Sequence, residues 1–388
     1  MVPQEASLVV DVGNSATRLA VIYTDNRGTT HTVGKALYNT FAVRDKSINI
    51  SDEYTDDNTY LFNPVGRLPE MDGDFVDQYV GGLMARREYG AMSIRPTALD
   101  HKYDAITTLF TMNVAFAEGF RILSSELGVP IEELDVTWGV NVLLPPAELG
   151  VYTDENSGAS KMSQLVRSIH EIDFSMPHIK KDIHIGKRGV TLLPEGYCAY
   201  IGVMFGPDKA PKQEYSEYLP GTVLVVDIGA GTTDFIVVKS GTAVEHTKFT
   251  ENFGGNNIIQ LARRVAKGSG FTISSDGVVG AMSTGYAMDG VNKVDMRPAI
   301  TAAQSKGSSR LVNSLIDFLE ENSFPVNEIN HVLCVGGGAS KPQVEGLKPI
   351  SDYIVGALKR FSPNVGVIPI SSGVSTRELN IMGAEILS

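Results

Sequence analysis

The sequence contains very little cysteine, with only Cys198 and Cys334 among its 388 residues. The two lie far apart, and neither belongs to a CxxC pair or a cysteine–histidine cluster, so the sequence does not predict a zinc site. Each stands inside an apolar stretch, GYCAYIGV and HVLCVGGG, which favours buried, reduced thiols. The seven histidines form no HxxEH or similar pair, so they do not predict a metal centre either.

Long apolar runs and excess positive charge are also missing. No apolar run approaches the roughly 18 residues that cross a bilayer, and neither end is typical of a basic amphipathic helix. The first residues, MVPQEASLVV, lack the pattern of a signal peptide, so the expected location is the cytoplasm. The net charge of −12 predicts no direct binding to nucleic acid or an anionic membrane. The basic pairs Lys180-Lys181 and Lys187-Arg188 are accordingly interpreted as a solvated hairpin.

What the sequence does contain suits a two-lobed α/β protein. The chain is longer than one typical domain, and its 43% apolar and 20% charged residues are typical of globular proteins. Stretches with the alternation of strands are interspersed with stretches of helical periodicity, which predicts α/β layers. Strands are predicted over 7–12, 18–23, 134–144 and 331–335, and helices over 103–127, 256–267 and 308–321. Trp138, the single tryptophan, lies in a predicted strand and is expected to fill the core.

The polar, proline-containing segment 206–220 is the best candidate for a linker. It divides the chain into a predicted lobe I over 1–219 and a predicted lobe II over 220–376. Irregular sequence at about 38–100 and Gly/Ser-rich sequence at about 269–306 predict one smaller inserted subdomain in each lobe. Residues 377–388 are expected to form a C-terminal helix that packs back on lobe I.

One strand–turn–strand pattern occurs twice, as LVVDVGNSATRLAVI from residue 8 and VLVVDIGAGTTDFIVV from residue 223. Asp11 and Asp227 end the first strand of each copy. Backbone N–H groups in such turns bind phosphate oxygens, and Ser15 and Thr17 add hydroxyl donors in the first copy. Either hairpin alone is also ordinary turn chemistry. Together they predict that two loops clamp the β- and γ-phosphates of one nucleotide while both aspartates hold Mg²⁺ through its waters.

A third glycine-rich turn follows the strand HVLCV, where Gly336, Gly337 and Gly338 precede another helix. Backbone without side chains can pack flat against a base and ribose, and a helix N-terminus then points at the ligand. Alternatively, this is a strand-to-helix turn that only needs positive φ angles.

The order of these motifs resembles the actin/heat-shock-chaperone/hexokinase superfamily. The motifs span nearly the whole chain and are Asp11-x-Gly13, Leu193-Pro194-Glu195, the Asp227 loop, the triple glycine and Gly383-Ala384. Within that superfamily, DVGNSATRLAVI and KYDAITTLFTMNVAFAEGF are most similar to the plasmid-segregation actins of the ParM/StbA type. The resemblance implies an α/β, actin-like fold: two lobes of related ribonuclease-H-like topology, a nucleotide cleft between them, and a smaller inserted subdomain on each.

The same resemblance implies roles for single residues. Arg18 stands where many relatives have lysine, which keeps the charge but changes its geometry. Gly255 begins the helix that approaches the ribose, although the acidic residue often found after the paired glycines is missing. The implied phosphate loops are Gly13, Asn14, Ser15 and Arg18, and Gly229, Ala230, Gly231 and Thr232; the implied adenosine site is Gly336, Gly337 and Gly338; the implied Mg²⁺ ligands are Asp11 and Asp227.

Glu195 and Asp227 are the implied catalytic residues. Hydrolysis needs a water in line with the γ-phosphorus, oriented by an acceptor beyond the phosphate. Glu195 follows a strand and Pro194, at the position that resembles the catalytic Glu or Gln of these ATPases. Its alternative role is to stabilise a helix N-terminus, where a carboxylate is favoured anyway.

The resemblance implies an ATPase that polymerises into dynamic filaments on binding ATP and Mg²⁺, disassembles after hydrolysis, and segregates plasmid or other DNA. GTP is an alternative nucleotide, because backbone glycines contact both bases similarly. The expected partners are further copies of the chain and a small DNA-binding adaptor, with no direct contact to nucleic acid or membrane. Two other functions stay open: a small-molecule kinase, whose substrate pocket would lie within 38–100, and a cytoskeletal scaffold without a role in segregation.

Overall fold

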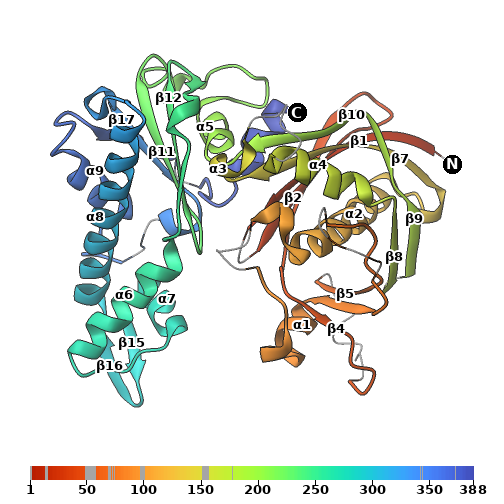
Figure 1. Cartoon of the computed structure of the whole chain (residues 1–388), viewed down its shortest axis with the longest axis horizontal. Helices are drawn as coiled ribbons and strands as arrows, with labels where there is room; N and C mark the ends of the chain where they lie inside the picture. The colour runs from red at the N-terminus through yellow and green to blue at the C-terminus, as the bar shows by residue number, and fades with distance from the viewer. Residues whose placement is uncertain are drawn as a thin grey trace. The chain divides into compact units, whose positions relative to one another are not determined.

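A computed structural model of the chain describes residues 2–13, 16–48, 58–68, 71, 73, 75–96, 101–150, 157–176, 178–340, 342, 344–371 and 373–388. The contacts divide the chain into two compact units, which are described separately below. The first unit comprises Met1–Pro194 with Leu387–Ser388, and the second comprises Glu195–Ile386. Each unit is built on one mixed β-sheet with helices packed against it (Figure 1).

The main sheet of the first unit has the strand order β10-β7-β1-β2-β3. Strands β1, β2 and β3 form an antiparallel meander, whereas β7 runs parallel to β1 and β10 runs parallel to β7. Leu8, Val9 and Val10 in the centre of β1 are fully buried, as a strand in the middle of a sheet requires. The bounds are β1 Val2–Val12, β2 Thr17–Thr24, β3 Thr30–Leu37, β7 Leu134–Leu144 and β10 His184–Pro194.

Helix α2 (Ile106–Leu127) packs against β1 and β2 and is buried along most of its length. It ends where Gly128 takes a left-handed conformation and its N–H donates to the carbonyl of Ser124. The fully buried ring of Trp138 contacts the rings of Phe116 and Phe120 on α2, which confirms its predicted place in the core. The other helices of this unit are α1 Leu83–Glu88, α3 Pro146–Leu149 and α4 Gly158–Ser168.

A second sheet in the first unit has the order β4-β6-β5-β8-β9. Three of its strands come from the predicted insertion at 38–100, and they pair through β8 with chain near residue 175. Residues 49–57, 69–70, 72, 74 and 97–100 of that predicted insertion lie outside the described residues. The bounds are β4 Phe41–Val43, β5 Thr59–Phe62, β6 Tyr79–Gly82, β8 Glu171–Met176 and β9 His178–Asp182.

The second unit repeats the first sheet. Its order is β13-β12-β11-β17-β18, with β14 also paired to β12. Strands β11, β12 and β13 are antiparallel, whereas β17 runs parallel to β11 and β18 runs parallel to β17. Order and directions therefore match the first unit, which confirms the predicted α/β class and the related topology of the two lobes. The bounds are β11 Thr222–Ile228, β12 Thr233–Lys239, β13 Thr242–Ala243, β14 Phe249–Glu251, β17 His331–Val335 and β18 Gly366–Val367.

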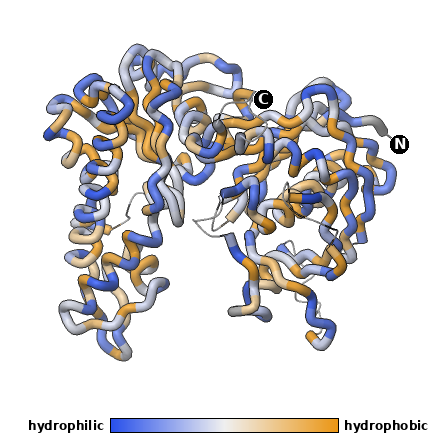
Figure 2. The backbone as a smooth tube through the Cα atoms, in the orientation of Figure 1, coloured by the Kyte–Doolittle hydropathy of each residue, from blue (hydrophilic) through white to orange (hydrophobic). Residues whose placement is uncertain are grey.

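Helix α8 packs against α6 and α9 beside this sheet (Figure 1). In Figure 2 the central strands of the sheet are coloured mainly hydrophobic, in keeping with their buried valine and leucine side chains. No helix among the described residues is both long and apolar enough to cross a membrane. The bounds are α5 Tyr197–Met204, α6 Gly255–Gly268, α7 Ser275–Thr284, β15 Tyr286–Asp289, β16 Asn292–Asp295, α8 Arg297–Glu321, α9 Ile350–Leu358 and α10 Leu379–Leu387.

The division found from the contacts differs from the predicted boundary at 219/220. Tyr200 on α5 is buried against the β11 sheet, so the chain enters the second unit directly after β10. The segment predicted as a linker is packed there as well, because Tyr215 is buried and its hydroxyl lies 2.8 Å from Ser371 Oγ. The C-terminal helix shares this core through Leu379, and only Leu387–Ser388 group with the first unit.

Glu385 on α10 is expected to make the stability of the fold depend on pH. Burial raises the pKa of its carboxyl from 4.5 to about 7. As the pH rises through this interval, the unfolded chain releases the proton before the folded chain does, so the free energy of unfolding falls. Glu385→Gln removes the titrating group and is expected to flatten this decline by on the order of 1 kcal/mol, allowing for solvent screening. Urea unfolding of both proteins at about pH 5 and about pH 7.5 measures the effect, and equal declines would contradict it.

Candidate functional site

The first predicted phosphate loop is the tip of the β1–β2 hairpin. Asp11 pairs with Arg18 and Val12 with Thr17 in the antiparallel register, so the predicted loop follows directly where this pairing ends. Directly opposite side chains of such a pair share one face of the sheet. Asp11 and Arg18 therefore lie on the same face next to the loop, and both are partly exposed. A carboxylate and a guanidinium thus stand together where the loop begins and ends.

The loop is anchored by a residue that the motif analysis did not single out. Asn39 is buried, and its Nδ2 donates to the carbonyl oxygen of Gly13 at 2.5 Å. Thr17, another predicted hydroxyl donor, is fully buried, and its Oγ1 makes no hydrogen bond within the described part of the chain, so its role as a donor to phosphate stays a prediction. Asn14 and Ser15, the other predicted loop residues, lie outside the described residues.

The second predicted phosphate loop lies at the same place in the second sheet. Asp227 pairs with Asp234 and Ile228 with Thr233, so residues 229–232 form the loop. Asp227 therefore corresponds in register to Asp11. The repeat noticed in the sequence is a repeat of strand pairing as well.

The second loop offers backbone donors that the protein does not use itself. Gly229 N–H donates to the carbonyl of Thr232 at 2.9 Å and closes the turn. In the part of the chain that the structure describes, the N–H groups of Ala230, Gly231 and Thr232 donate no hydrogen bond. All three residues are partly exposed. Consecutive N–H groups at a turn form a concave site for anions, so this loop can bind phosphate oxygens.

Helix α6 holds the same loop from behind. The N–H of Gly255 donates to the carbonyl of Gly229 at 2.9 Å, and the N–H of Asn256 donates to the carbonyl of Ala230 at 2.8 Å. The carbonyl groups of Gly229 and Ala230 therefore face α6, and the N–H groups of the loop face away from that helix. Since the N–H of Gly255 is already engaged, this residue shapes the loop and has no backbone donor left for a ligand.

The triple glycine packs directly beside Asp227. Gly336 has φ 83° and ψ 174°, and a Cβ placed on it would lie only 2.2 Å from Asp227 Oδ1. The turn is tied to the segment before α10, because Gly336 N–H donates to the carbonyl of Thr376 and Thr376 Oγ1 donates back to the carbonyl of Gly336. The exposed Arg377 lies over Gly337, with Nε 3.4 Å from the position of a Cβ there. The sequence analysis missed both Thr376 and Arg377.

Two buried carboxylates share one face at the end of β11. Asp227 and Asp234 are 5% and 4% exposed and lie directly opposite each other. Thr250 Oγ1 donates to Asp234 Oδ1, and Asn380 Nδ2 donates to Asp227 Oδ2, both at 2.6 Å. Like charges at opposed positions repel each other, and a bound cation offsets that repulsion. These oxygens are the ligand type that Mg²⁺ prefers, so the residues present fit a divalent cation.

No group of three or more His, Cys, Asp and Glu side chains arranged to hold a metal is found among the described residues. A cation at Asp227 would therefore keep other ligands, such as water or phosphate oxygens. This is the usual mode for Mg²⁺, which loses its water reluctantly. Cys198 and Cys334 are both buried, as predicted from their apolar surroundings.

Glu195 lies in the turn between β10 and α5 and is 7% exposed. Gly196 is the residue that caps α5, and the first turn of α5 contains no acidic residue. Glu195 thus precedes the cap, outside the positions where a carboxylate stabilises a helix most, which weakens the alternative role as a helix-terminus charge. Gly196 N–H donates to Asn380 Oδ1 at 2.9 Å, so this turn is joined to the same asparagine that binds Asp227.

The repeated sheet with an aspartate-rooted hairpin in each copy is typical of the actin-like fold, and solved structures share this fold over nearly the full length. The actin-like protein Alp7A has a TM-score of 0.64 at 15% identity, over 100% of this chain and 96% of its own. The archaeal actin homologue Ta0583 has a TM-score of 0.62 at 16% identity, over 98% of each chain. A ParM from a 15-stranded filament of Clostridium botulinum has a TM-score of 0.55 at 13% identity, over 98% of this chain and 97% of its own.

These identities establish the fold alone, and the fold is the actin-like one that the motifs predict. More particularly, residues 225–344 match the family model of the archaeal actin homologue MreB-like, C-terminal. That segment contains the second loop, α6 and the triple glycine. The predicted resemblance to actin-like proteins, ParM among them, is thereby confirmed. No curated protein matches the chain.

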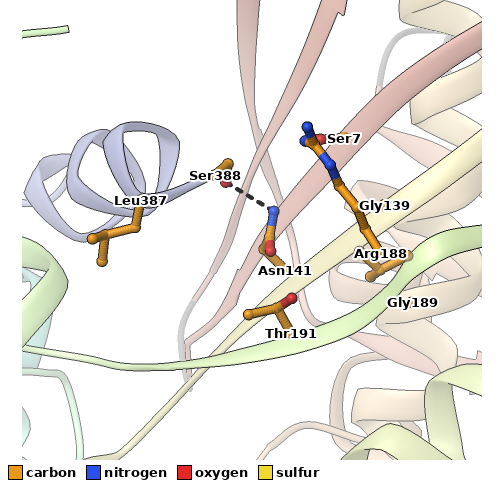
Figure 3. A pocket seen from close by; sticks show the side chains of 9 residues that line it. Ser7, Gly139, Asn141, Arg188, Gly189, Thr191, Leu387 and Ser388 are labelled. Atoms are coloured by element: carbon orange, nitrogen blue, oxygen red, sulfur yellow. Dashed lines mark hydrogen bonds between the residues drawn. The ribbon is translucent and has the colours of Figure 1, made fainter. Parts of the chain in front are cut away.

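A polar hollow of about 200 Å³ in the first unit is separate from the predicted site. Figure 3 shows Arg188 beside Ser7 and Asn141 directed at Ser388, to whose Oγ its Nδ2 donates at 2.8 Å. None of the predicted nucleotide-binding residues lines it.

The basic pairs do not share one hairpin, so that prediction is wrong. Lys180 and Lys181 lie in β9, which pairs with β8, whereas Lys187 and Arg188 lie in an irregular stretch of β10. The reason is that β9 pairs with β8 whereas β10 pairs with β7, so the two basic pairs belong to strands of different sheets.

Proposed function

We propose that this chain is an actin-like ATPase that binds a nucleoside triphosphate with Mg²⁺ and assembles with itself into filaments. The observation that carries the proposal is the 229–232 loop, whose open N–H groups lie next to the buried Asp227. Such a combination suits a phosphate chain with its cation, because donors serve the phosphate oxygens and the carboxylate serves the metal. The fold adds support, since Ta0583 was crystallised in complex with ADP.

In this proposal the two hairpin loops contact the phosphates of one nucleotide. Asp11 and Asp227 would hold Mg²⁺, and the ion would supply positive charge that offsets part of the negative charge on the phosphate oxygens. The guanidinium of Arg18 and the N–H groups of the second loop take up the remaining charge. The proposed roles are phosphate binding by Gly13, Asn14, Ser15, Arg18, Gly229, Ala230, Gly231 and Thr232; Mg²⁺ binding by Asp11 and Asp227; and adenosine binding by Gly336, Gly337, Gly338 and, without its engaged N–H group, Gly255.

Glu195 orients the attacking water in the proposed reaction. Its carboxylate accepts a hydrogen bond from the water and takes a proton from it as the water oxygen bonds to the γ-phosphorus and the bond from the γ-phosphorus to the bridging oxygen breaks. The nucleoside diphosphate is the leaving group. Asp227 contributes through the metal rather than through proton transfer, because Oδ2 already accepts a hydrogen bond from Asn380. ATP is the proposed nucleotide, with GTP as the alternative to be tested by competition.

Nucleotide is expected to control assembly. The purified protein should pellet in the ultracentrifuge and scatter light with ATP and Mg²⁺, and should do so far less with ADP or without nucleotide. Self-assembly is suggested by the ParM filament that shares the fold. Asp227→Asn, which weakens the proposed metal site, serves as the matched control and should stay in the supernatant. A chain that stays monomeric at high concentration and transfers phosphate to a metabolite would be a kinase instead.

The cellular role proposed from the resemblance is segregation of plasmid or other DNA. With a net charge of −12, the chain itself is poorly suited to bind DNA directly. A small, basic DNA-binding adaptor is therefore the proposed second partner. A filament that no such adaptor binds would favour the scaffold without a role in segregation.

A further inference from the structure

Asn380 on α10 joins two parts of the proposed site through one side chain. It is 8% exposed, Nδ2 donates to Asp227 Oδ2 at 2.6 Å, and Oδ1 accepts from Gly196 N–H at 2.9 Å. Both ends of the amide are therefore in use. All three residues belong to the second unit, so the connection lies within one compact body.

The position of Asn380 is fixed by close helix packing. Helix α10 meets α5 where both present a glycine: a Cβ on Gly383 would lie 1.6 Å from the carbonyl oxygen of Cys198. A Cβ on Gly202 would likewise lie 2.6 Å from the carbonyl oxygen of Leu379. The two backbones thus touch within one turn of Asn380. An asparagine on so closely packed a helix has little freedom to move away from its partners.

The chemistry of the two partners selects asparagine. Asp227 needs a donor and Gly196 N–H needs an acceptor, and a carboxamide of this length supplies both. Aspartate would keep the acceptor but would set a second carboxylate against Asp227. An aliphatic residue would leave a buried N–H and a carboxylate oxygen without these bonds, which is unfavourable in a protein interior. A position chosen only for packing would not need this polarity.

We propose that Asn380 is a positioning residue that keeps the Mg²⁺-binding carboxylate of Asp227 in a fixed relation to the Glu195–Gly196 turn. The inference rests on the proposed function. The side chain of Asn380 thereby couples the position of Asp227, which binds the cation, to that of Glu195, which orients the water. Among the described residues, Asp234 lies opposite Asp227 on β12, and Arg377 stands three residues before Asn380 in the sequence. Asn380 itself touches neither water nor phosphate in this role.

Two substitutions separate the two hydrogen bonds. Asn380→Ala removes both, and is expected to lower kcat about 10-fold and to raise the Mg²⁺ concentration for half-maximal turnover several-fold, because small misplacements of reacting groups are costly. Asn380→Asp keeps the acceptor for Gly196 N–H, so it should retain more of kcat while shifting the Mg²⁺ dependence. Fluorescence titration of nucleotide without Mg²⁺ should give similar Kd values for all variants.

The matched control is Asn330→Ala. Asn330 Oδ1 accepts from the N–H of Thr222, at the opposite end of the strand that ends near Asp227. This variant loses an asparagine-to-backbone bond on the same strand and should lower the melting temperature with kcat and Mg²⁺ dependence unchanged. If folded Asn380→Ala behaves like this control, the proposal is overturned. Should Asn380→Ala not fold, the isosteric Asn380→Asp decides, and an unchanged Mg²⁺ dependence there overturns the proposal equally.

Failure of the proposed function has a different signature. A wild-type chain without Mg²⁺-dependent turnover contradicts the ATPase itself. The link between the two residues is then measured from the melting temperatures of Asn380→Asp, Asp227→Asn and the double variant. In the double variant the amide of the new asparagine at position 227 can donate to the carboxylate of the new aspartate at position 380. The double variant should therefore melt higher than Asn380→Asp alone. A double variant that melts at the additive value would show that the two side chains are not coupled.

Discussion

Replacing Glu195 with alanine is expected to slow phosphate release at least about 100-fold while filaments still form with ATP. An oriented acceptor for the attacking water contributes about 10²–10⁴-fold in comparable reactions. Nucleotide binding should persist, because the loop donors and Asp227 are untouched. Helix α5 should also persist, because Glu195 lies before its capping residue Gly196 and outside its first turn.

The measurement is phosphate release over time from pelleted filaments of the wild type and the variant. Glu195→Gln keeps the size and removes the basic oxygen, so it should be nearly as slow as the alanine variant. Glu320→Ala, at an exposed position on α8, is the control for loss of a carboxylate elsewhere. Unchanged phosphate release in both Glu195 variants would remove this residue from the mechanism.

Replacing Gly336 with alanine is expected to abolish nucleotide binding and to destabilise the second unit by more than about 3 kcal/mol. Its φ of 83° and ψ of 174° fall in a region that is essentially limited to glycine, at a cost of about 1–3 kcal/mol for other residues. The added Cβ would also lie 2.2 Å from Asp227 Oδ1, so either the strand end or the carboxylate must shift. Overpacking of this kind costs about 1–3 kcal/mol more.

Gly346→Ala is the control that separates the effect of crowding against Asp227 from the effect of backbone strain at a positive φ angle. Gly346 also has a positive φ, 87°, but a Cβ there would meet no heavy atom within 4 Å. Its replacement should cost about 1–2 kcal/mol and leave nucleotide affinity unchanged. Denaturant unfolding and nucleotide titration of both variants test the difference. Equal losses in the two variants would mean that the crowding against Asp227 has no role.

Regular elements with a clear period were predictable from the sequence. The strand predicted over 134–144 has those bounds as β7, and the helix predicted over 256–267 corresponds to Gly255–Gly268. Both have strong local signals: an apolar run closed by prolines in one case, and a wide apolar face after paired glycines in the other. The repeated hairpins were visible for the same reason, since each is a local pattern.

Helix α8 was predicted to begin at residue 308 but begins at Arg297. The Gly/Ser-rich sequence at about 269–306 was predicted to belong to an inserted subdomain rather than to this helix, and glycine lowers helix propensity. In the structure Gly307 is a helix residue packed against Ile258 and Phe253, with both within 3.3 Å of the place of a Cβ. The small residue serves the close approach of α8 to α6. That requirement comes from tertiary packing and leaves no local signal.

In the candidate site, too, contacts between residues far apart in the sequence could not be predicted. The two loops and the triple glycine were found because glycines and aspartates mark them along the chain. Asn380 was missed, since its bond to Asp227 joins residues 153 positions apart. A usable hint was present: Asn380 is a polar residue between Leu379 and Ile381 in an apolar helix, and a buried polar side chain must find a partner. The hint predicts that a partner exists without saying which one.

The strand order and strand directions of the two main sheets match, so the protein contains one structural unit twice. Two identical halves would offer a ligand two identical ends. The two hairpins differ in sequence, however, because one copy carries Asn14 and Ser15 where the other carries Ala230 and Gly231. This difference suits an asymmetric ligand such as a nucleoside triphosphate, because its successive phosphates and its base each require different contacts.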